Sequence, residues 1–279
     1  MTTYSQAGGE RPVRIPDIKA RKARGEKIVM LTAYDAWMSR ILAACGTVDM
    51  LLVGDSLGMV ELGYDTTIPV TMNDVVRHTR AVRAGAPHAL IVADMPFLSH
   101  RISPASAMRN VGRLMQQGGA TAVKVEGGTA IAETVERIVA AGIPVMGHLG
   151  LQPQSVHALG GFRRQFTRPE EQLQLMEDAA ALEKAGVFAI VLECVPDELA
   201  GEVTAALSVP VIGIGSGPHC DGQVLVTHDI LGLSGPQTPP FVRQYAQLGE
   251  EIRTAVKSFA EDVRSGAFPN ARSRQTLNV

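Results

Sequence analysis

Eight short apolar segments alternate with stretches of helical pattern along the chain, and this alternation constrains the fold more than any other feature. The expected strands are residues 28–33, 49–53, 90–94, 122–126, 143–147, 187–193, 210–215 and 223–227. Continuous apolar runs of this length are typical of parallel strands, which are buried on both faces. Eight such strands with intervening helices predict an α/β fold of the (β/α)8 TIM-barrel type.

The two ends of the chain add helices to this plan. A short basic helix is expected at residues 17–24, and additional C-terminal helices are expected over 241–265. Apolar residues spaced three and four apart in the second stretch place one apolar face on it. At 279 residues the chain fits a single barrel domain spanning 1–279. The polar segments 1–14 and 269–279 are expected to be flexible tails.

Composition excludes several classes of protein. Hydrophobic residues make up 46% and charged residues 19%, with a net charge of −2, so no basic surface for nucleic acid or anionic membrane is expected. The three cysteines have no CxxC spacing and are interpreted as free thiols in a reducing compartment. There is neither a signal-peptide core nor a run of roughly 18 apolar residues. These features favour a soluble, cytoplasmic protein that acts on small molecules.

Five of the apolar segments end in polar residues where a parallel strand would stop. In a barrel, the carboxyl ends of the strands meet at one face and carry the active site. The residues expected to converge there are Asp55, Ser56, Asp94, Lys124, Glu126, His148 and Glu193. This convergence predicts an enzyme.

Asp55 and Asp94 both follow strands. Two carboxylates in one cleft repel each other unless a cation or a proton lies between them. Oxygen ligands without a Cys–His cluster favour a hard ion such as Mg²⁺. Either aspartate alone is more simply an N-cap or a turn residue, but two at adjacent strand ends favour the metal site.

Lys124 and Glu126 lie two residues apart on one strand, so their side chains point the same way. A buried Lys–Glu pair can be purely structural, yet buried charge is costly, which favours a functional role. His148 lies in the sequence GHLG, where hydrogen bonding to a backbone carbonyl and a functional role are both open.

Glu193 ends an almost wholly apolar strand. Such surroundings disfavour the charged form of a carboxyl group, which suits a general base working near neutral pH. Pairing with an arginine is the structural alternative. The glycines of GIGSG at 213–217 lack the full GxGxxG pattern, so tight turns or backbone contact with a ligand explain them better than dinucleotide binding.

With these residues in place, the chain resembles the ketopantoate hydroxymethyltransferase family. The resemblance runs from about residue 15 to 268, and GDSLGM and GHLGLxPQS are its longest and most specific motifs. The matching stretches, in family order, are MLTAYDA, LLVGDSLGMV, TIPVTMNDVVRHTRAV, VADMPF, AVKVEGG, PVMGHLGLQPQSV, VLECVP, PVIGIGSG and DGQVLV.

The resemblance implies a Mg²⁺-dependent barrel that uses 5,10-methylenetetrahydrofolate and a 2-oxo acid and assembles as a homo-oligomer, often a decamer. The implied metal ligands are Asp55, Asp94 and Glu126, and Glu193 is the implied base. Asp55, Ser56, Asp94, Lys124 and His148 are the implied substrate-binding residues. The implied reaction transfers a hydroxymethyl group to 3-methyl-2-oxobutanoate through a Mg²⁺-stabilised enolate, giving 2-dehydropantoate for pantothenate synthesis.

The chain departs from the family where GGFRRQFT at 160–167 replaces the usual GGYKVQG, and where GIGSG replaces GIGAG. The first segment is expected to form a mobile cover over the pocket, since paired glycines allow unusual backbone angles.

Two other functions are compatible with a barrel of this kind. A Mg²⁺-dependent lyase or mutase would carry a nucleophile or acid loop that is not found here, and a non-catalytic acid-binding barrel would lack one of the four carboxylates.

Overall fold

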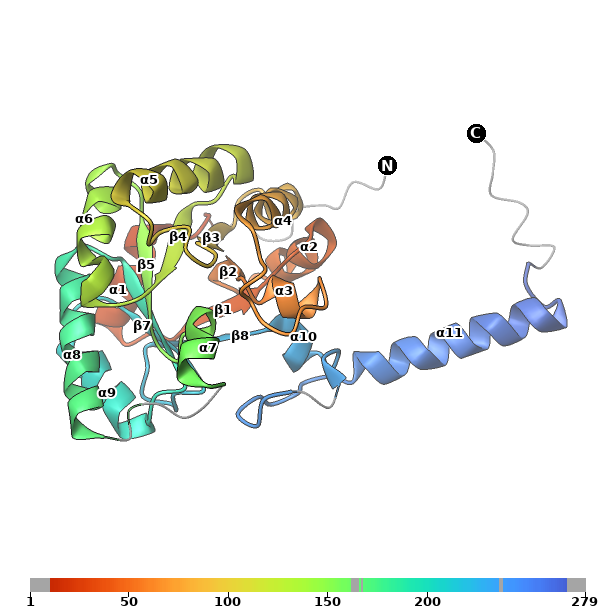
Figure 1. The fold of residues 1–279 in the computed structure, drawn as a ribbon. Coiled ribbons are helices and arrows are strands. Elements are labelled where there is room, and N and C mark those ends of the chain that lie inside the picture. The colour runs from red at the N-terminus through yellow and green to blue at the C-terminus, as the bar shows by residue number, and fades with distance from the viewer. Residues whose placement is uncertain (1–10, 162–165, 167, 236–237, 270–279) are drawn as a thin grey trace. The chain divides into compact units, whose positions relative to one another are not determined.

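The chain folds into a closed barrel of eight parallel strands, as expected from the sequence. The computed structural model describes residues 11–161, 166, 168–235 and 238–269. Neighbouring strands pair in sequence order, and β8 pairs with β1 to close the ring. Figure 1 shows helices lying outside this ring. The strands are β1 (Ile28–Thr32), β2 (Met50–Val53), β3 (Leu90–Asp94), β4 (Ala122–Glu126), β5 (Val145–Gly150), β6 (Ala189–Glu193), β7 (Val211–Ile214) and β8 (Gly222–Leu225).

Local sequence signals mark where several of the helices between the strands begin. At the start of one of them, α4, the side chain of Thr71 accepts a hydrogen bond from the backbone N–H of Asp74, which forms a capping box. The longer helices between the strands are α2 (Ala36–Ala44), α4 (Met72–Gly85), α5 (Pro104–Arg113), α6 (Ala132–Ala140), α8 (Pro169–Lys184) and α9 (Asp197–Ala206). Short turns α3 (Leu57–Val60), η2 (Thr129–Ile131), η3 (Pro153–Ser155) and α7 (Val156–Leu159) lie in the loops after strands.

Two hydrophobic clusters form because side chains alternate across each strand. Outward-facing residues such as Val123 and Ile190 pack in the larger cluster together with residues of the surrounding helices. Inward-facing residues form the second cluster, named here the apolar layer. Its members from the strands are Ile28, Met30, Met50, Leu52, Leu90, Val92, Ala122, Met146, Ala189, Val191, Ile212 and Val224. Ile18 of α1 (Ile15–Arg24) belongs to the same cluster and is fully buried.

The structure corrects several boundaries of the predicted plan. The strand expected at 187–193 begins at Ala189, and the strand expected at 223–227 ends at Leu225. Strand β5 covers Val145–Gly150 instead of 143–147, so His148 lies within the strand. The helix expected to run unbroken to residue 117 changes at Leu114 into a π-helical turn, η1 (Leu114–Gly118). The pattern of apolar residues does not distinguish a π turn from an α turn, because both bury Leu114.

Backbone contacts divide the chain into two compact units, residues 1–226 and 227–279. The second unit contains α10 (Thr227–Ile230) and α11 (Leu248–Ser265). α11 is one long helix within the predicted stretch 241–265, whereas α10 was not predicted and begins where the last strand was expected to end. The apolar face of α11 is shorter than predicted, because Phe241 and Tyr245 lie before the helix begins. Single-domain behaviour of 1–279 and flexible tails at 1–14 and 269–279 stay predictions. Among the described residues, no helix is both long enough and apolar enough to cross a membrane.

Candidate active site

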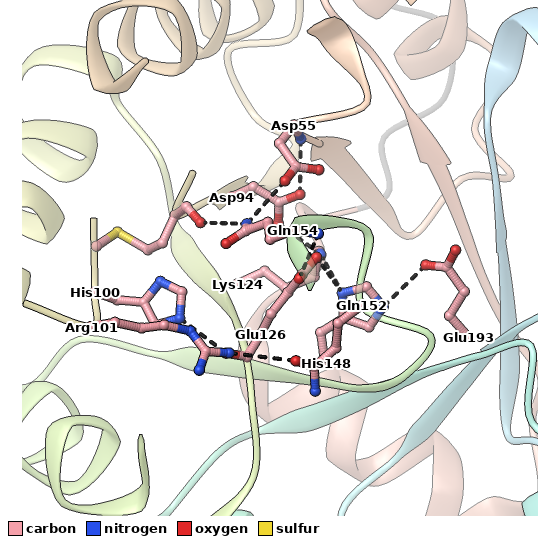
Figure 2. A network of polar contacts seen from close by, with 11 residues as sticks. Asp55, Asp94, His100, Arg101, Lys124, Glu126, His148, Gln152, Gln154 and Glu193 are labelled. Atoms are coloured by element: carbon pink, nitrogen blue, oxygen red, sulfur yellow. Dashed lines mark hydrogen bonds and ion pairs between the residues drawn. The ribbon is translucent and has the colours of Figure 1, made fainter. Parts of the chain in front are cut away.

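Charged residues replace apolar ones at the carboxyl ends of the strands, on the same inward face. In β4, Ala122 belongs to the apolar layer, and Lys124 and Glu126 follow it at spacings of two. Asp94 continues the inward face of β3, and His148 and Glu193 continue those of β5 and β6. We call Asp55, Asp94, Lys124, Glu126, His148 and Glu193 the polar layer; Figure 2 shows these side chains gathered in one network.

Strand register places opposite charges side by side. Asp94 is the register partner of Lys124 across β3 and β4, and Lys124 Nζ lies 2.9 Å from Asp94 Oδ1. Glu126 is likewise the partner of His148 across β4 and β5, with 3.3 Å between Oε1 and Nδ1. The pairing of parallel strands therefore builds two buried pairs that the linear sequence separates by more than twenty residues.

Asp55 and Ser56 join the site from the loop that follows β2. The backbone N–H of Asp55 donates to Asp94 Oδ2 at 3.0 Å, and the Ser56 hydroxyl lies 2.8 Å from that of Tyr34. Gly54 makes this close approach possible, because a Cβ at that position would lie 2.8 Å from Ser56 Oγ. Asp55 and Ser56 thus lie at the edge of the polar layer, as expected.

His148 connects the two sides of the polar layer. Its Nδ1 lies 3.1 Å from Lys124 Nζ as well as 3.3 Å from Glu126, and its Nε2 lies 3.1 Å from Glu193 Oε2. A neutral imidazole would accept from Lys124 at Nδ1, whereas a protonated one donates to both glutamates. Burial and the charge of Lys124 disfavour protonation, but the two glutamates outweigh them and raise the pKa of His148 to about 9. The protonated form therefore prevails at neutral pH.

Glu193 is held at the end of β6, opposite Gly150 of β5. Gly150 has φ +95°, and a Cβ there would lie 2.2 Å from the backbone oxygen of Glu193, so only glycine fits this junction. The surroundings of Glu193 differ from the apolar ones expected from the sequence. Its side chain is 18% exposed and contacts His148, which takes the place of the arginine partner considered above.

Burial and mutual repulsion change the ionisation of the carboxylates. Burial, followed by the charges of Asp94 and Glu126, raises the pKa of Asp55 to about 8. Burial also raises the pKa of Asp94, although Lys124 opposes the change. Burial opposes the charge of Lys124 as well, but the carboxylates of Asp94, Glu126 and Asp55 prevail and raise its pKa. Burial and the neighbouring carboxylates thus make the charged forms of Asp55 and Asp94 costly, even with Lys124 and His148 close by.

These carboxylates fit a hard divalent cation. Asp94 Oδ1 and Glu126 Oε1 are buried without a well-aligned hydrogen bond among the described residues, although each lies near a cationic group. In the part of the chain that the structure describes, no group of three or more His, Cys, Asp or Glu side chains is arranged to hold a metal ion. Mg²⁺ does not require such a group, because it commonly binds one or two carboxylates and completes its shell with water or substrate oxygens.

Sequence reasoning missed several polar residues that hold the site in place. Tyr34 contacts Ser56, and Gln154 Nε2 donates to Asp55 Oδ2 at 2.9 Å. His100 Nε2 and Arg101 Nη2 both lie within hydrogen-bonding distance of the Glu126 backbone oxygen, at 3.0 and 2.8 Å. Burial lowers the pKa of His100 to about 4, so this imidazole is neutral and donates that bond. All four residues follow strands, which is the one signal that pointed toward them.

The GIGSG segment forms a turn at the end of β7. Gly215 and Gly217 have φ +62° and +74°, values that favour glycine. Between them, the buried Ser216 hydroxyl donates to the Leu192 backbone oxygen and accepts from the Val195 N–H. The turn chemistry expected for these glycines is therefore present. Most of the departing segment 160–167, and with it the expected mobile cover, lies outside the described residues.

Comparison of the sequence with known proteins gives a family match over almost the whole chain. The family model described as ketopantoate hydroxymethyltransferase matches residues 12–271. A 3-methyl-2-oxobutanoate hydroxymethyltransferase of Moorella thermoacetica is 57% identical over 258 residues, covering 92% of this chain and 96% of its own. The protein of that name from Syntrophus aciditrophicus is 53% identical over 270 residues, covering 97% and 98% of the two chains.

Solved structures share the fold at low sequence identity. A 2,3-dimethylmalate lyase of the PEP mutase/isocitrate lyase superfamily aligns with a TM-score of 0.59 and 15% identity, covering 94% of this chain and 91% of its own. A phosphonopyruvate hydrolase aligns with a TM-score of 0.60 and 13% identity, covering 94% and 93%. At these identities the likeness supports the barrel architecture alone.

Proposed function

Since the chain belongs to the ketopantoate hydroxymethyltransferase family, we propose that it transfers a hydroxymethyl group from 5,10-methylenetetrahydrofolate to 3-methyl-2-oxobutanoate. The product would be 2-dehydropantoate, a precursor of pantothenate and coenzyme A. The observation that carries the proposal is the polar layer, in which three buried carboxylates, a lysine and a histidine–glutamate pair meet at the carboxyl ends of the strands.

Asp55 and Asp94 are proposed to hold Mg²⁺, with Glu126 completing or supporting its shell. The bound ion would supply Lewis-acid chemistry, polarising the keto group so that the C3 proton of the oxo acid becomes more acidic. The Lys124 ammonium, 2.9 Å from Asp94, provides a fixed positive charge for the carboxylate end of the substrate. The Ser56 hydroxyl, oriented by Tyr34, provides a hydrogen bond to the same end.

Glu193 is proposed as the general base that removes the C3 proton. Its side chain is 18% exposed, and its Oε2 lies 3.1 Å from His148 Nε2. The C3–H electron pair then attacks the methylene carbon of the folate, forming a C–C bond as the first of its two carbon–nitrogen bonds breaks. Water displaces the second nitrogen and supplies the hydroxyl oxygen. The C3 proton taken by Glu193 and one proton of the water end on the two folate nitrogens, so tetrahydrofolate leaves. His148 holds the Glu193 carboxylate in position through its Nε2 contact.

Proton exchange at C3 tests this assignment without folate. In deuterated water, the parent protein with Mg²⁺ should exchange the C3 proton of 3-methyl-2-oxobutanoate, and Glu193→Gln should slow that exchange by about 10²–10⁴-fold. Glu198→Gln, which changes an exposed glutamate on α9, is the matched control. Parent-like exchange in Glu193→Gln would exclude Glu193 as the base and make His148 the next residue to test.

The folate requirement separates this function from a lyase built on the same fold. A hydroxymethyltransferase makes product only when 5,10-methylenetetrahydrofolate is present, whereas a lyase cleaves its substrate without it. Product formation assayed with and without the folate distinguishes the two. Folate-independent cleavage of a 2-oxo acid or its adduct would contradict the proposal.

We also propose a cytoplasmic homo-oligomer, with a decamer as the expected assembly. Support comes from α11, whose apolar residues Ile252, Val256, Phe259 and Val263 are all exposed and spaced to lie on one face. A second copy of the chain would cover such a face. Light scattering should give a mass several times that of one chain, and Val256→Asp should lower it. An unchanged mass in that variant would count against α11 as the interface.

A further inference from the structure

We propose that Gln154 is a positioning residue that fixes the spacing of the metal-binding carboxylates. Its side-chain Nε2 donates to Asp55 Oδ2 and to the Met95 backbone oxygen, each at 2.9 Å. Its backbone N–H donates to Glu126 Oε2 at 3.2 Å. Figure 2 shows Gln154 between Asp55 and Glu126. One residue thereby contacts two of the proposed metal ligands and the residue next to the third, Asp94.

The orientation of the Gln154 amide follows from its partners. Both groups that its Nε2 meets, a carboxylate and a backbone carbonyl, are acceptors, so the amide nitrogen and not the oxygen must face them. Both N–H bonds are used, and the side chain is only 6% exposed. The amide therefore has one favourable orientation, which points a donor at Asp55.

The other end of the amide shows that packing alone does not explain glutamine at this position. Gln154 Oε1 is buried and has no hydrogen-bond partner among the described residues. Burying an oxygen in this way is unfavourable, and a methionine of similar length would avoid that cost. The two hydrogen bonds of the amide nitrogen, to Asp55 and to the Met95 backbone oxygen, thus compensate for the cost of burying Oε1.

Gln154 acts from outside the strands that carry the ligands. It lies in η3, after β5, whereas Asp55 follows β2, Met95 follows β3 and Glu126 ends β4. A cation held by Asp55 and Asp94, with Glu126 completing or supporting its shell, needs these three chain segments at fixed separations, which surrounding hydrogen bonds provide. The role rests on the proposed metal site, and it makes Gln154 an outer residue that orients the ligands without binding the ion.

Manganese binding provides the test, because Mn²⁺ substitutes for Mg²⁺ and gives an electron paramagnetic resonance signal. The parent, Gln154→Met and Gln152→Met are titrated with Mn²⁺ alone. Gln152→Met is a matched control from the same turn, whose side-chain contact is to Arg101, 3.4 Å away. We expect Gln154→Met to weaken Mn²⁺ binding by about 10–100-fold and Gln152→Met to leave it within about twofold of the parent.

A second readout separates positioning from a general structural role. At saturating Mn²⁺, Gln154→Met should recover C3 proton exchange of 3-methyl-2-oxobutanoate to within about tenfold of the parent, because the base is untouched. If Gln154→Met does not fold, Gln154→Asn, which withdraws the amide by one methylene, replaces it.

Each remaining outcome overturns the inference in a recognisable way. Parent-like Mn²⁺ affinity in Gln154→Met would exclude the positioning role and leave the metal site standing. A parent protein that binds no Mn²⁺ would remove the proposed metal site and the role of Gln154 together. Failure of both Gln154 variants to fold without metal would make Gln154 a structural residue.

Discussion

The two halves of the barrel interior are built from the same strands but have opposite character. In β3, Leu90 and Val92 belong to the apolar layer, and the next inward residue is Asp94. In β6, Ala189 and Val191 are likewise followed by Glu193. A step of two residues therefore changes a close-packed core into a cluster of charges. Residues in the first half are explained by packing, whereas those in the second half are not.

The energetic contrast explains why the difference is informative. Apolar side chains in the apolar layer gain free energy from burial and need no partner. Charges in the polar layer lose hydration, which mutual pairing offsets only in part, as the raised pKa of Asp55 (about 8) indicates. Such a cluster costs stability, and binding of the proposed cation would offset part of that cost.

Removing one charge from the polar layer should have the largest effect on catalysis. Asp94→Asn keeps the volume of the side chain and removes a proposed metal ligand. Hydroxymethyl transfer should fall by more than about 100-fold, since loss of an outer partner alone costs roughly 10–100-fold. Calorimetric titration with Mg²⁺ should show the matching loss of affinity. Glu136→Gln, which neutralises an exposed carboxylate on α6, is the control; normal Mg²⁺ affinity in Asp94→Asn would contradict the metal assignment.

Shortening a side chain in the apolar layer should affect stability instead of chemistry. Ile212 is fully buried there, and Ile212→Ala should lower the free energy of unfolding by about 2–5 kcal/mol through lost burial and a cavity. Urea unfolding measures this change. Below the unfolding transition, the KM for the oxo acid should stay at the parent value. A large change in KM with unchanged stability would show that the two halves are not separate in function.

The pH dependence of stability should report on His148. Its pKa rises from 6.5 to about 9 on folding, so its stabilising contribution is complete below about pH 6.5 and disappears as the pH rises through 9. Metal-free parent protein should lose on the order of 1–3 kcal/mol over this range. Asp55, with its pKa raised to about 8, also lowers the free energy of unfolding as the pH rises towards 8.

His148→Gln should flatten this pH dependence without abolishing it, because Asp55 still contributes. Urea unfolding in the presence of a chelator, at several pH values between 6.5 and 9, measures the slope. His88→Gln, a change in an exposed histidine, should keep the slope of the parent. Equal slopes in His148→Gln and the parent would show that His148 is not protonated in the folded protein.

The smallest effect is expected from Tyr34, whose hydroxyl contacts Ser56 beside the polar layer. Tyr34→Phe removes the hydroxyl that lies 2.8 Å from Ser56 Oγ. Loss of one hydrogen bond of about 0.5–1.5 kcal/mol should raise the KM for the oxo acid roughly 2–10-fold while kcat stays close to that of the parent. Steady-state kinetics of Tyr34→Phe and of Tyr64→Phe, an exposed tyrosine, make the comparison. An unchanged KM would remove Tyr34 from substrate binding.

Sequence patterns were sufficient for the elements whose signals are local. Strands β3 and β4 lie where predicted, because an apolar run ends in a charged residue in each case. The gathering of Asp55, Asp94, Lys124, Glu126, His148 and Glu193 was also predictable, since parallel strands bring their carboxyl ends to one face.

Contacts that depend on strand register and on loop conformation could not be predicted. The pairing of Glu126 with His148 follows from the offset between β4 and β5, which no local pattern specifies. Gln154 reaches Asp55 across 99 positions of the chain through a short 3₁₀ turn. Phe241 and Tyr245 have the same three- and four-residue spacing as the apolar residues of α11, yet they lie before the helix. Periodicity alone does not mark where a helix begins.

One measurement addresses the central claim that the polar layer is a metal-dependent site for a 2-oxo acid. Crystals grown with Mn²⁺ and 3-methyl-2-oxobutanoate give an anomalous signal that locates the metal directly. We expect one strong anomalous peak in contact with the carboxylates of Asp55 and Asp94. The oxo acid should lie beside it, with its C3 atom facing Glu193. A peak away from these carboxylates, or an oxo acid bound outside the polar layer, would contradict the central claim.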